Sequence, residues 1–429
     1  MLESIYLGMT GLLGYSRGLK VIANNTANMN TPGFKGSTLQ FADLFYSNGN
    51  LGSGSGGRNY GQVGYGLDTK GTTFNFRQGE LRQTSNDLDA AIDGLGLFNL
   101  KDDAGNIHYT RAGQFQFNAD GVLVNRSDNA KVMGLDANGA LTEISLSGLK
   151  THAGAATTTI KFSGNLSSST TDQTVKGITV IDAAGGEHAL TLNFTGFAGN
   201  TPGTPPTPGL PPTPGLPPTP GIPPIPTIPT TPNTPGFWNV ALMDGNTTVG
   251  TGMIRFQDGK PDPATAKISM TYRAKNLAPI PLTFDFSGDV TSFAGGTLST
   301  LAVASQDGYG PGAMSKATFD AAGNLVLTYS NGQTSKAARL ALSRFDSLDA
   351  VTAVGNNQFT ASGTQAWQLG KAGDSGFGAV RAGQIEISNV DLSQEFSDLV
   401  VMQRGYQSSS QVITTANEML QELFSMKGK

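Results

Sequence analysis

The residues that could do chemistry are few and lie far apart in the chain. His108, His152 and His188 are the only histidines among the 429 residues, and none neighbours another in the sequence. A metal site or a histidine-based catalytic triad needs several such groups close together, so this spacing argues against both kinds of site. The chain has no cysteine, which excludes thiolate nucleophiles, cysteine-ligated metals and disulfides.

Acidic residues recur in a short turn pattern that could suggest calcium binding. Asp or Asn opens each unit and Gly follows three residues later, in "DDAGNI" from 102, "NADGVL" from 118, "DANGAL" from 136 and "DAAGNL" from 320. No unit supplies the series of oxygen ligands or the closing bidentate Glu of a calcium loop. The pattern predicts hairpin turns in which Gly takes a positive φ. The pair Asp102 and Asp103 is then part of a solvated turn.

Glycine-rich segments and charge give no sign of nucleotide or nucleic-acid chemistry. In "GLGLFNL", residues 94–100, Asn99 stands where a dinucleotide-binding fingerprint has its third glycine. The net charge is -4, and no cluster of Lys and Arg offers a phosphate-binding surface. We therefore expect no enzymatic activity, no cofactor, no metal and no nucleic-acid partner.

The start of the chain reads as a helix that stops abruptly. The segment "ANNTANMNTPGFK", residues 23–35, follows the helical stretch and holds Asn residues that tolerate left-handed backbone. Its last part fits a type II turn, with Pro at the second position and Gly at the third. The turn therefore separates a short terminal helix from the part of the protein that follows. The residues that carry this turn are Asn24, Asn25, Asn28, Thr31, Pro32, Gly33 and Phe34.

Both ends of the chain carry seams typical of coiled coils. Apolar residues recur every three or four positions near the start and once per heptad near the end, with polar rungs in the middle of the second seam. Four glycines weaken the first helix, by roughly 1 kcal/mol each relative to Ala. Asp391 and Gln394 suggest a capping box at the start of the second helix. The predicted assembly interface comprises Leu2, Ile5, Met9, Leu12, Leu19, Leu392, Phe396, Leu399, Tyr406, Ile413, Leu420 and Phe424.

Between the two helices the composition and pattern are those of a β protein. The chain contains 57 glycines and only 14% charged residues, which favours strands and tight turns. Alternating residues predict strands from Gln62 to about Lys150, and "LVLTYSNG" from 325 should pair with them. The section in between, 151–305, has its own β pattern and reads as an insertion. Within it, 202–235 holds sixteen of the 22 prolines and favours polyproline II. This proline-rich segment is either a tolerated surface insertion or a segment that docks onto a partner.

No run of about 18 apolar residues predicts a membrane span. The first residues also lack the positive n-region and the clear cleavage site of a secretory signal. If the protein leaves the cell, we expect it to do so without a cleaved signal peptide.

Two long terminal motifs carry a family resemblance. "ANNTANMNTPGFK" resembles the signature of bacterial flagellar rod and hook proteins, and "SNVDLSQEFSDLVVMQRGYQSSSQVITTANEMLQEL", residues 388–423, is similar to their C-terminal signature. "GLGLFNL", "QDGYGPG" from 306 and "LVLTYSNGQTSKAARLALSRF" from 325 resemble hook proteins more closely. The resemblance covers roughly 1–150 and 300–429, and the proline-rich insertion departs from the usual hook pattern.

The resemblance implies a fold, a function and partners. The fold would be a mainly β multi-domain body with α-helical coiled-coil termini and nested discontinuous domains. The function would be that of a hook subunit, which self-assembles into a flexible curved tube that transmits torque from rod to filament. The partners would be the chain itself as a helical homopolymer, the rod, hook-cap and hook-filament junction proteins, and the flagellar export apparatus. The location would be the extracellular flagellum, without membrane insertion.

The expected domains follow the same nesting: a terminal coiled coil (1–30 and 390–429), an extended connecting region (31–71 and 360–389), an inner β domain (72–150 and 306–359) and an outer β domain (151–305). Two alternatives stay open at this point. A distal rod protein shares both terminal signatures but usually lacks so large an insertion. A secreted β-rich adhesin or enzyme with helical ends would carry its site in the outer domain.

Overall fold

The computed structural model describes residues 2–48, 62–136, 138–196, 236–273, 278–345, 351–361 and 367–427. The proline-rich segment 202–235 lies outside these residues. The chain divides into two compact units. Unit 1 comprises 1–150, 314–328 and 334–429, and unit 2 comprises 151–313 and 329–333. The described chain is mainly β-strand with one helix at each end, as the sequence predicted. The finer division into four domains stays a prediction.

The two helices of unit 1 are α1 (Leu2–Ala27) and α2 (Leu392–Lys427). Asp391 caps α2, because its Oδ1 accepts hydrogen bonds from the amides of Ser393 at 2.8 Å and Gln394 at 3.3 Å. The predicted capping box is not completed. The Gln394 side chain donates to Asp398 Oδ1 at 3.0 Å, one turn further along the helix.

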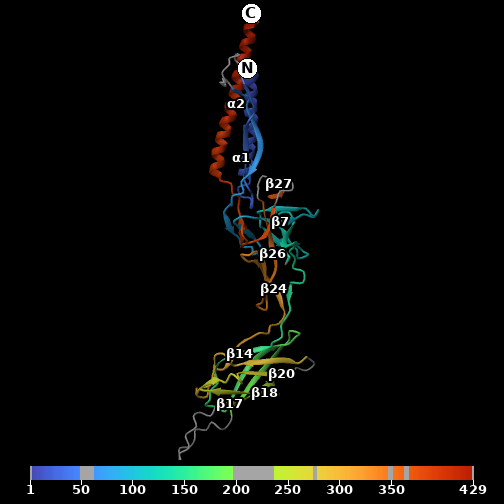
Figure 1. The fold of residues 1–429 in the computed structure, drawn as a ribbon, viewed down its shortest axis with the longest axis vertical. Coiled ribbons are helices and arrows are strands. Elements are labelled where there is room, and N and C mark those ends of the chain that lie inside the picture. Colours follow the sequence, from blue (N-terminus) through green and yellow to red (C-terminus); the bar gives the residue numbers. More distant parts are fainter. Residues whose placement is uncertain are drawn as a thin grey trace, which may run out of the picture. The chain divides into compact units, whose positions relative to one another are not determined.

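A β-hairpin lies along α1 within the expected extended connecting region. β1 (Ser37–Asp43) pairs antiparallel with β4 (Leu67–Phe74), and β2 (Tyr46–Asn48) pairs with β3 (Gln62–Gly64). Leu67 of β4 lies against Gly14 of α1, and the Arg17 guanidinium donates to the hydroxyl of Thr69. Figure 1 shows these strands beside the helix. The connecting region therefore supports the N-terminal helix directly.

Both halves of the chain contribute to one large sheet, as the nested plan predicted. The expected pairing of "LVLTYSNG" with the early strands is wrong, because β25 (Asn324–Tyr329) lies between the late strands Gly312–Phe319 and Thr334–Phe345. β26 (Thr334–Phe345) pairs with β7 and with β11, so late and early strands are neighbours. The predicted hairpin turns at 102, 118 and 136 connect paired strands. The sheet comprises β7 (Leu97–Lys101), β8 (Ile107–Thr110), β9 (Phe115–Phe117), β10 (Leu123–Asn125), β11 (Lys131–Leu135), β12 (Leu141–Glu143), β13 (Thr151–His152), β24 (Gly312–Phe319), β25 (Asn324–Tyr329), β26, β27 (Val351–Gly355), β28 (Gln358–Ala361) and β29 (Trp367–Lys371).

Two short strand pairs tie the C-terminal part of unit 1 to the early strands. β5 (Leu81–Gln83) pairs with β31 (Gln384–Glu386), and β6 (Ala90–Asp93) pairs with β30 (Ala379–Ala382). The chain that leads into α2 is therefore held against the chain that follows α1.

Unit 2 consists of two sheets around one apolar core. The first contains β14 (Thr159–Asn165), β20 (Lys267–Tyr272), β21 (Ile280–Asp285), β22 (Val290–Thr291) and β23 (Ala302–Gln306). The second runs in the order β15 (Asp172–Ile181), β16 (Glu187–Gly196), β17 (Gly236–Asp244), β18 (Thr247–Gln257) and β19 (Lys260–Pro261). In β20 exposed and buried residues alternate strictly, so one face of the strand enters the core. Phe162, Phe194, Trp238 and Phe284, from both sheets, share that core.

Candidate assembly site

The terminal helices pack against each other through glycines. A Cβ on Gly8 would lie 2.6 Å from Ile413 Cγ1, one on Gly11 would lie 2.6 Å from Ser409 Oγ, and one on Gly18 would lie 2.9 Å from Met402 Sδ. As the α1 number rises the α2 number falls, so the helices are antiparallel neighbours (Figure 1). Small residues let the two backbones approach closely. From the sequence these glycines were predicted only to weaken the helix. Their role in the helix contact was not predicted, although their spacing places them on one face.

The predicted seam residues divide between this interface and the surface. Ile5, Leu12, Leu19, Leu392, Leu399, Ile413 and Leu420 are half-buried. Met9, Phe396, Tyr406 and Phe424 are exposed, Phe424 by 73%. Leu2 lies in α1, and its side chain is outside the described part of the structure. Whether these residues form contacts between subunits stays a prediction.

An apolar surface remains open on both helices. Its members are large apolar side chains that are exposed to water. They are Tyr6, Leu7, Met9 and Leu13 of α1, and Phe396, Val400, Val401, Tyr406, Val412, Met419, Leu423, Phe424 and Met426 of α2. We call this set the open apolar face. So many exposed large apolar groups on two adjacent helices are typical of a protein-protein contact.

The turn that ends α1 is held by its own side chains. Gly33 has a φ of 73°, and the Phe34 amide donates to the carbonyl of Thr31 at 3.2 Å, which meets both requirements of the predicted type II turn. Thr31 Oγ1 donates to Asn28 Oδ1 at 3.1 Å, and Asn28 Nδ2 donates to the Asn24 carbonyl at 3.0 Å. Any Cβ at position 33 would lie 2.4 Å from the Ala112 amide nitrogen, so only glycine fits there.

The remaining residues of this turn connect it to distant parts of unit 1. Buried Asn25 donates to Glu395 Oε1 of α2 at 2.9 Å and to the Ser37 carbonyl at 2.8 Å, and its Oδ1 accepts from the Ser37 amide. The Pro32 carbonyl accepts a hydrogen bond from Asn357 Nδ2 at 3.0 Å. Three separate elements are therefore joined at the end of α1.

A buried charge cluster lies directly after the turn. Glu386 of β31 accepts hydrogen bonds from Lys35 Nζ at 2.5 Å, from Arg111 Nη1 at 3.0 Å and from the Gly79 amide at 2.8 Å. The three charged side chains are almost completely buried. Burial lowers the pKa of Lys35 below its ordinary value of 10.5, and Arg111 acts in the same direction, against the opposing effect of Glu386. The cluster ties the start of the chain to the strand that leads into α2.

These three residues were not predicted from the sequence. Lys35 ends the quoted N-terminal motif, and Glu386 lies just before the C-terminal one, so their positions next to the two signatures were the available signal. Arg111 gave no sign in the sequence, because only the fold brings it between them.

The three histidines contact side chains of nearby turns and strands. His108 Nε2 lies 3.2 Å from Asp102 Oδ2, and His188 Nε2 lies 2.9 Å from Asp182 Oδ2, each across a hairpin turn. His152 packs on the ring of Tyr329 at 4.9 Å. Among the described residues, no group of three His, Asp or Glu is placed to hold a metal ion.

The hydroxyl of Tyr272 lies near a histidine and could suggest a catalytic role. Its hydroxyl donates to Asp244 Oδ2 at 2.9 Å and lies 3.5 Å from His188 Nδ1. Burial and the Asp244 carboxylate raise the pKa of Tyr272 to about 12. The hydroxyl is thus held protonated, which is the opposite of an activated nucleophile.

Within the described chain, neither helix is long and apolar enough to cross a membrane.

Three family models match parts of the chain. The flagellar basal body rod protein model matches residues 5–35, the flagellar hook protein FlgE/F/G D1 domain matches 91–168, and the flagellar basal body rod FlgEFG protein C-terminal model matches 381–426. The first and last cover the turn after α1 and the start of α2.

Curated relatives match over the whole length. The flagellar hook protein FlgE of Borreliella burgdorferi is 27% identical and covers 100% of both chains. That of Escherichia coli is 29% identical over 98% of both, and that of Salmonella typhimurium is 29% identical over 98% of both. A crystal structure of a Helicobacter pylori flagellar hook protein covers 71% of this chain and 100% of its own, with 14% identity and a TM-score of 0.45.

Proposed function

We infer that this chain, which belongs to the family of flagellar rod and hook proteins, is a structural subunit of the bacterial flagellar hook. The open apolar face supports this function best. One helix pair in a single chain leaves these side chains in water, at a cost of roughly 25 cal/mol for each Å² of apolar surface. Neighbouring copies of the same pair would remove that surface from water.

The proposed polymer is a helical tube with the paired helices innermost. Because every copy presents the same surfaces, a contact between two different faces repeats from copy to copy, and it produces a helical filament when the rotation does not close a ring. We propose that this filament is the curved tube that transmits torque from rod to filament. Its further partners would be the rod, hook-cap and hook-filament junction proteins and the export apparatus. Its location would be outside the cell, reached without a cleaved signal peptide. A purely structural role would need no catalytic group.

Electron microscopy of the purified protein under polymerising conditions tests the proposal. We expect tubes from the wild-type chain. Val401→Asp places a charge on the open apolar face, where Val401 is 61% exposed, so it should leave the monomer's helix content intact and prevent assembly.

The matched control is Gln407→Asp, which adds the same charge to an exposed polar residue of α2. We expect this variant to polymerise. Tubes formed equally well by Val401→Asp would contradict the assignment of the open apolar face, and a wild-type chain that forms no tubes would contradict the hook function.

A further inference from the structure

Unit 1 contains a pocket whose lining includes no residue of the open apolar face. It lies between the end of β4, the start of β7 and the end of β26 and encloses about 640 Å³. Phe74, Phe76, Leu97 and Phe345 supply apolar walls. Phe76 packs on Phe359 of the core at 5.1 Å between ring centroids, so this wall is supported from behind. The volume is within the range of roughly 300–1,000 Å³ typical of small-molecule sites.

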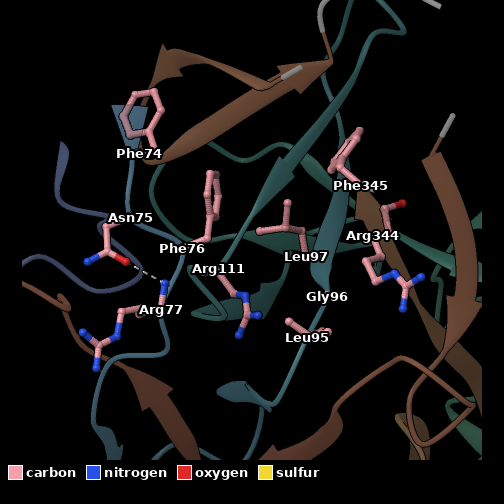
Figure 2. A pocket seen from close by; sticks show the side chains of 11 residues that line it. Phe74, Asn75, Phe76, Arg77, Leu95, Gly96, Leu97, Arg111, Arg344 and Phe345 are labelled. Atoms are coloured by element: carbon pink, nitrogen blue, oxygen red, sulfur yellow. Dashed lines mark hydrogen bonds between the residues drawn. The ribbon is translucent and has the colours of Figure 1, made fainter. Parts of the chain in front are cut away.

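The polar groups of the pocket are strongly biased toward positive charge. Three arginines line it, Arg77, Arg111 and Arg344, and the lining includes no Asp or Glu. Figure 2 shows Arg77 and Arg344 on opposite sides with Arg111 between them. In the part of the chain that the structure describes, the guanidinium of Arg77 has no ion pair or hydrogen bond. Arg344 Nη1 donates to the Gly376 carbonyl at 3.3 Å.

Arg111 borders the pocket, and one of its donors is unused but buried. Its side chain is only 5% exposed. Nη1 bonds to Glu386 and to the Ile92 carbonyl, and Nη2 bonds to the Gly94 carbonyl at 2.7 Å. Nε is buried and makes no hydrogen bond with any described residue. Arg111 therefore contributes to the pocket chiefly through its charge, which Glu386 and Lys35 leave with an excess of one positive charge in this cluster.

We propose that this pocket binds a carboxylate carried on an aromatic or other apolar body. A carboxylate is the planar acceptor that suits guanidinium donors, and its charge would offset the excess of arginine. The phenylalanine walls would hold the apolar body by burial and by edge-to-face contacts. The charged end would lie toward the arginines and the apolar end against Phe76.

The same chemistry could come from a free aromatic acid or from an acidic segment of a second copy of this chain. The first step of the test is independent of the hook function, because it uses the monomer. Benzoate is titrated into the protein and followed by methyl and amide NMR shifts, with benzamide as a neutral probe of the same shape. We expect saturable shifts around Leu97 with benzoate and none with benzamide.

Arg77→Gln is the variant that separates recognition from folding, because Arg77 is exposed and its guanidinium holds no other part of the described chain. We expect it to weaken benzoate binding by about tenfold or more, the loss typical of one charge-assisted hydrogen bond. The control is Arg82→Gln, which removes the same charge from an exposed residue outside the pocket and should leave binding unchanged. Absence of saturable benzoate binding, or equal losses in both variants, would overturn the proposal.

Assembled tubes then identify the source of the carboxylate. If polymerisation displaces benzoate from the pocket, and excess benzoate slows assembly, the natural occupant is a second copy. If tubes bind benzoate as tightly as monomers do, the occupant is a free carboxylate ligand.

Discussion

At the scale of single residues, Glu386 has the most consequential position in unit 1. Its carboxylate accepts from Lys35, Arg111 and the Gly79 amide, which come from three separate parts of the chain. Two buried cations around one anion would repel each other without it. The helix-ending turn and the strand that leads into α2 are therefore joined by a single acidic group.

Replacing this acid with its neutral isostere should destabilise unit 1 strongly. Glu386→Gln would leave two buried cations without a counter-charge and point an NH₂ group at them. We expect a loss of about 3–5 kcal/mol in the free energy of unfolding. Urea unfolding would follow the fluorescence of Trp367 in a Trp238→Phe background, since these are the two tryptophans of the chain. The control Glu80→Gln changes an exposed acid, and equal unfolding midpoints for the two variants would refute this role.

Glu395 makes the stability of the α1–α2 pair depend on pH. Burial, and secondarily the Asp398 charge, raise the pKa of Glu395 above its ordinary 4.5, against the hydrogen bond from Asn25. A raised folded-state pKa means that the folded chain binds the proton more readily than the unfolded chain does. This contribution to stability is fully present below pH 4.5 and is lost as the pH rises through the folded-state pKa.

We therefore expect Glu395→Gln, which keeps an oxygen acceptor for Asn25 without the charge, to reduce the pH dependence of helix pairing. Amide hydrogen exchange in α1, measured from pH 4 to pH 7 in both proteins, gives the comparison. Subtracting one profile from the other removes the titration of all other groups. A difference that does not change across this range would show that Glu395 titrates normally.

At the scale of elements, the pairing of α1 with α2 depends on residues that have no side chain. Gly11 should tolerate no substitution by a β-branched residue, since its Cβ alone would lie 2.6 Å from Ser409 Oγ. Gly11→Val should separate the helices, although valine has a better helix propensity than glycine. Because the chain has no cysteine, two introduced ones at Glu3 and Glu418 can carry spin labels that report the distance between the helices.

The matched control is Leu13→Val on the open apolar face, where the side chain is 55% exposed. We expect its spin-label distance in the monomer to equal that of the wild type. An unchanged distance in Gly11→Val would show that the helices do not pack through this glycine.

The same elements show how far the sequence could be used to predict the fold. Strands such as β20, with its strict alternation, and the Asp-Gly hairpin turns were predictable because their signals are local. The glycine-lined contact was not predicted because a Gly lowers helix propensity locally, and its benefit depends on a partner almost 400 residues away. Arg111 was not predicted for the same reason, because its burial and its contact with Glu386 depend on residues far away in the sequence.

At the scale of the whole molecule, the chain leaves unit 1 at residue 150 and returns to it at residue 314, so most of unit 2 is an insertion between two parts of unit 1. Such nesting permits large changes in the inserted unit without disturbing the helices. Within unit 2, β16 and β17 are antiparallel neighbours, with Gly196 opposite Trp238. Two strands paired in this way need only a short connection, so the long segment between them is not required by the topology.

Replacing residues 202–235 with a four-residue Gly/Ser turn should therefore leave unit 2 folded and the chain able to polymerise. Each doubling of loop length costs about 0.6 kcal/mol in closure entropy. Shortening this loop to roughly a quarter should thus raise the stability of unit 2 by about 1 kcal/mol. Urea unfolding followed by Trp238 fluorescence in a Trp367→Phe background measures that change, and electron microscopy measures assembly. Should the shortened chain fold with its β16–β17 pair intact and yet form no tubes, the proline-rich segment would itself be a primary contact between subunits, because nothing else in the interface would have changed.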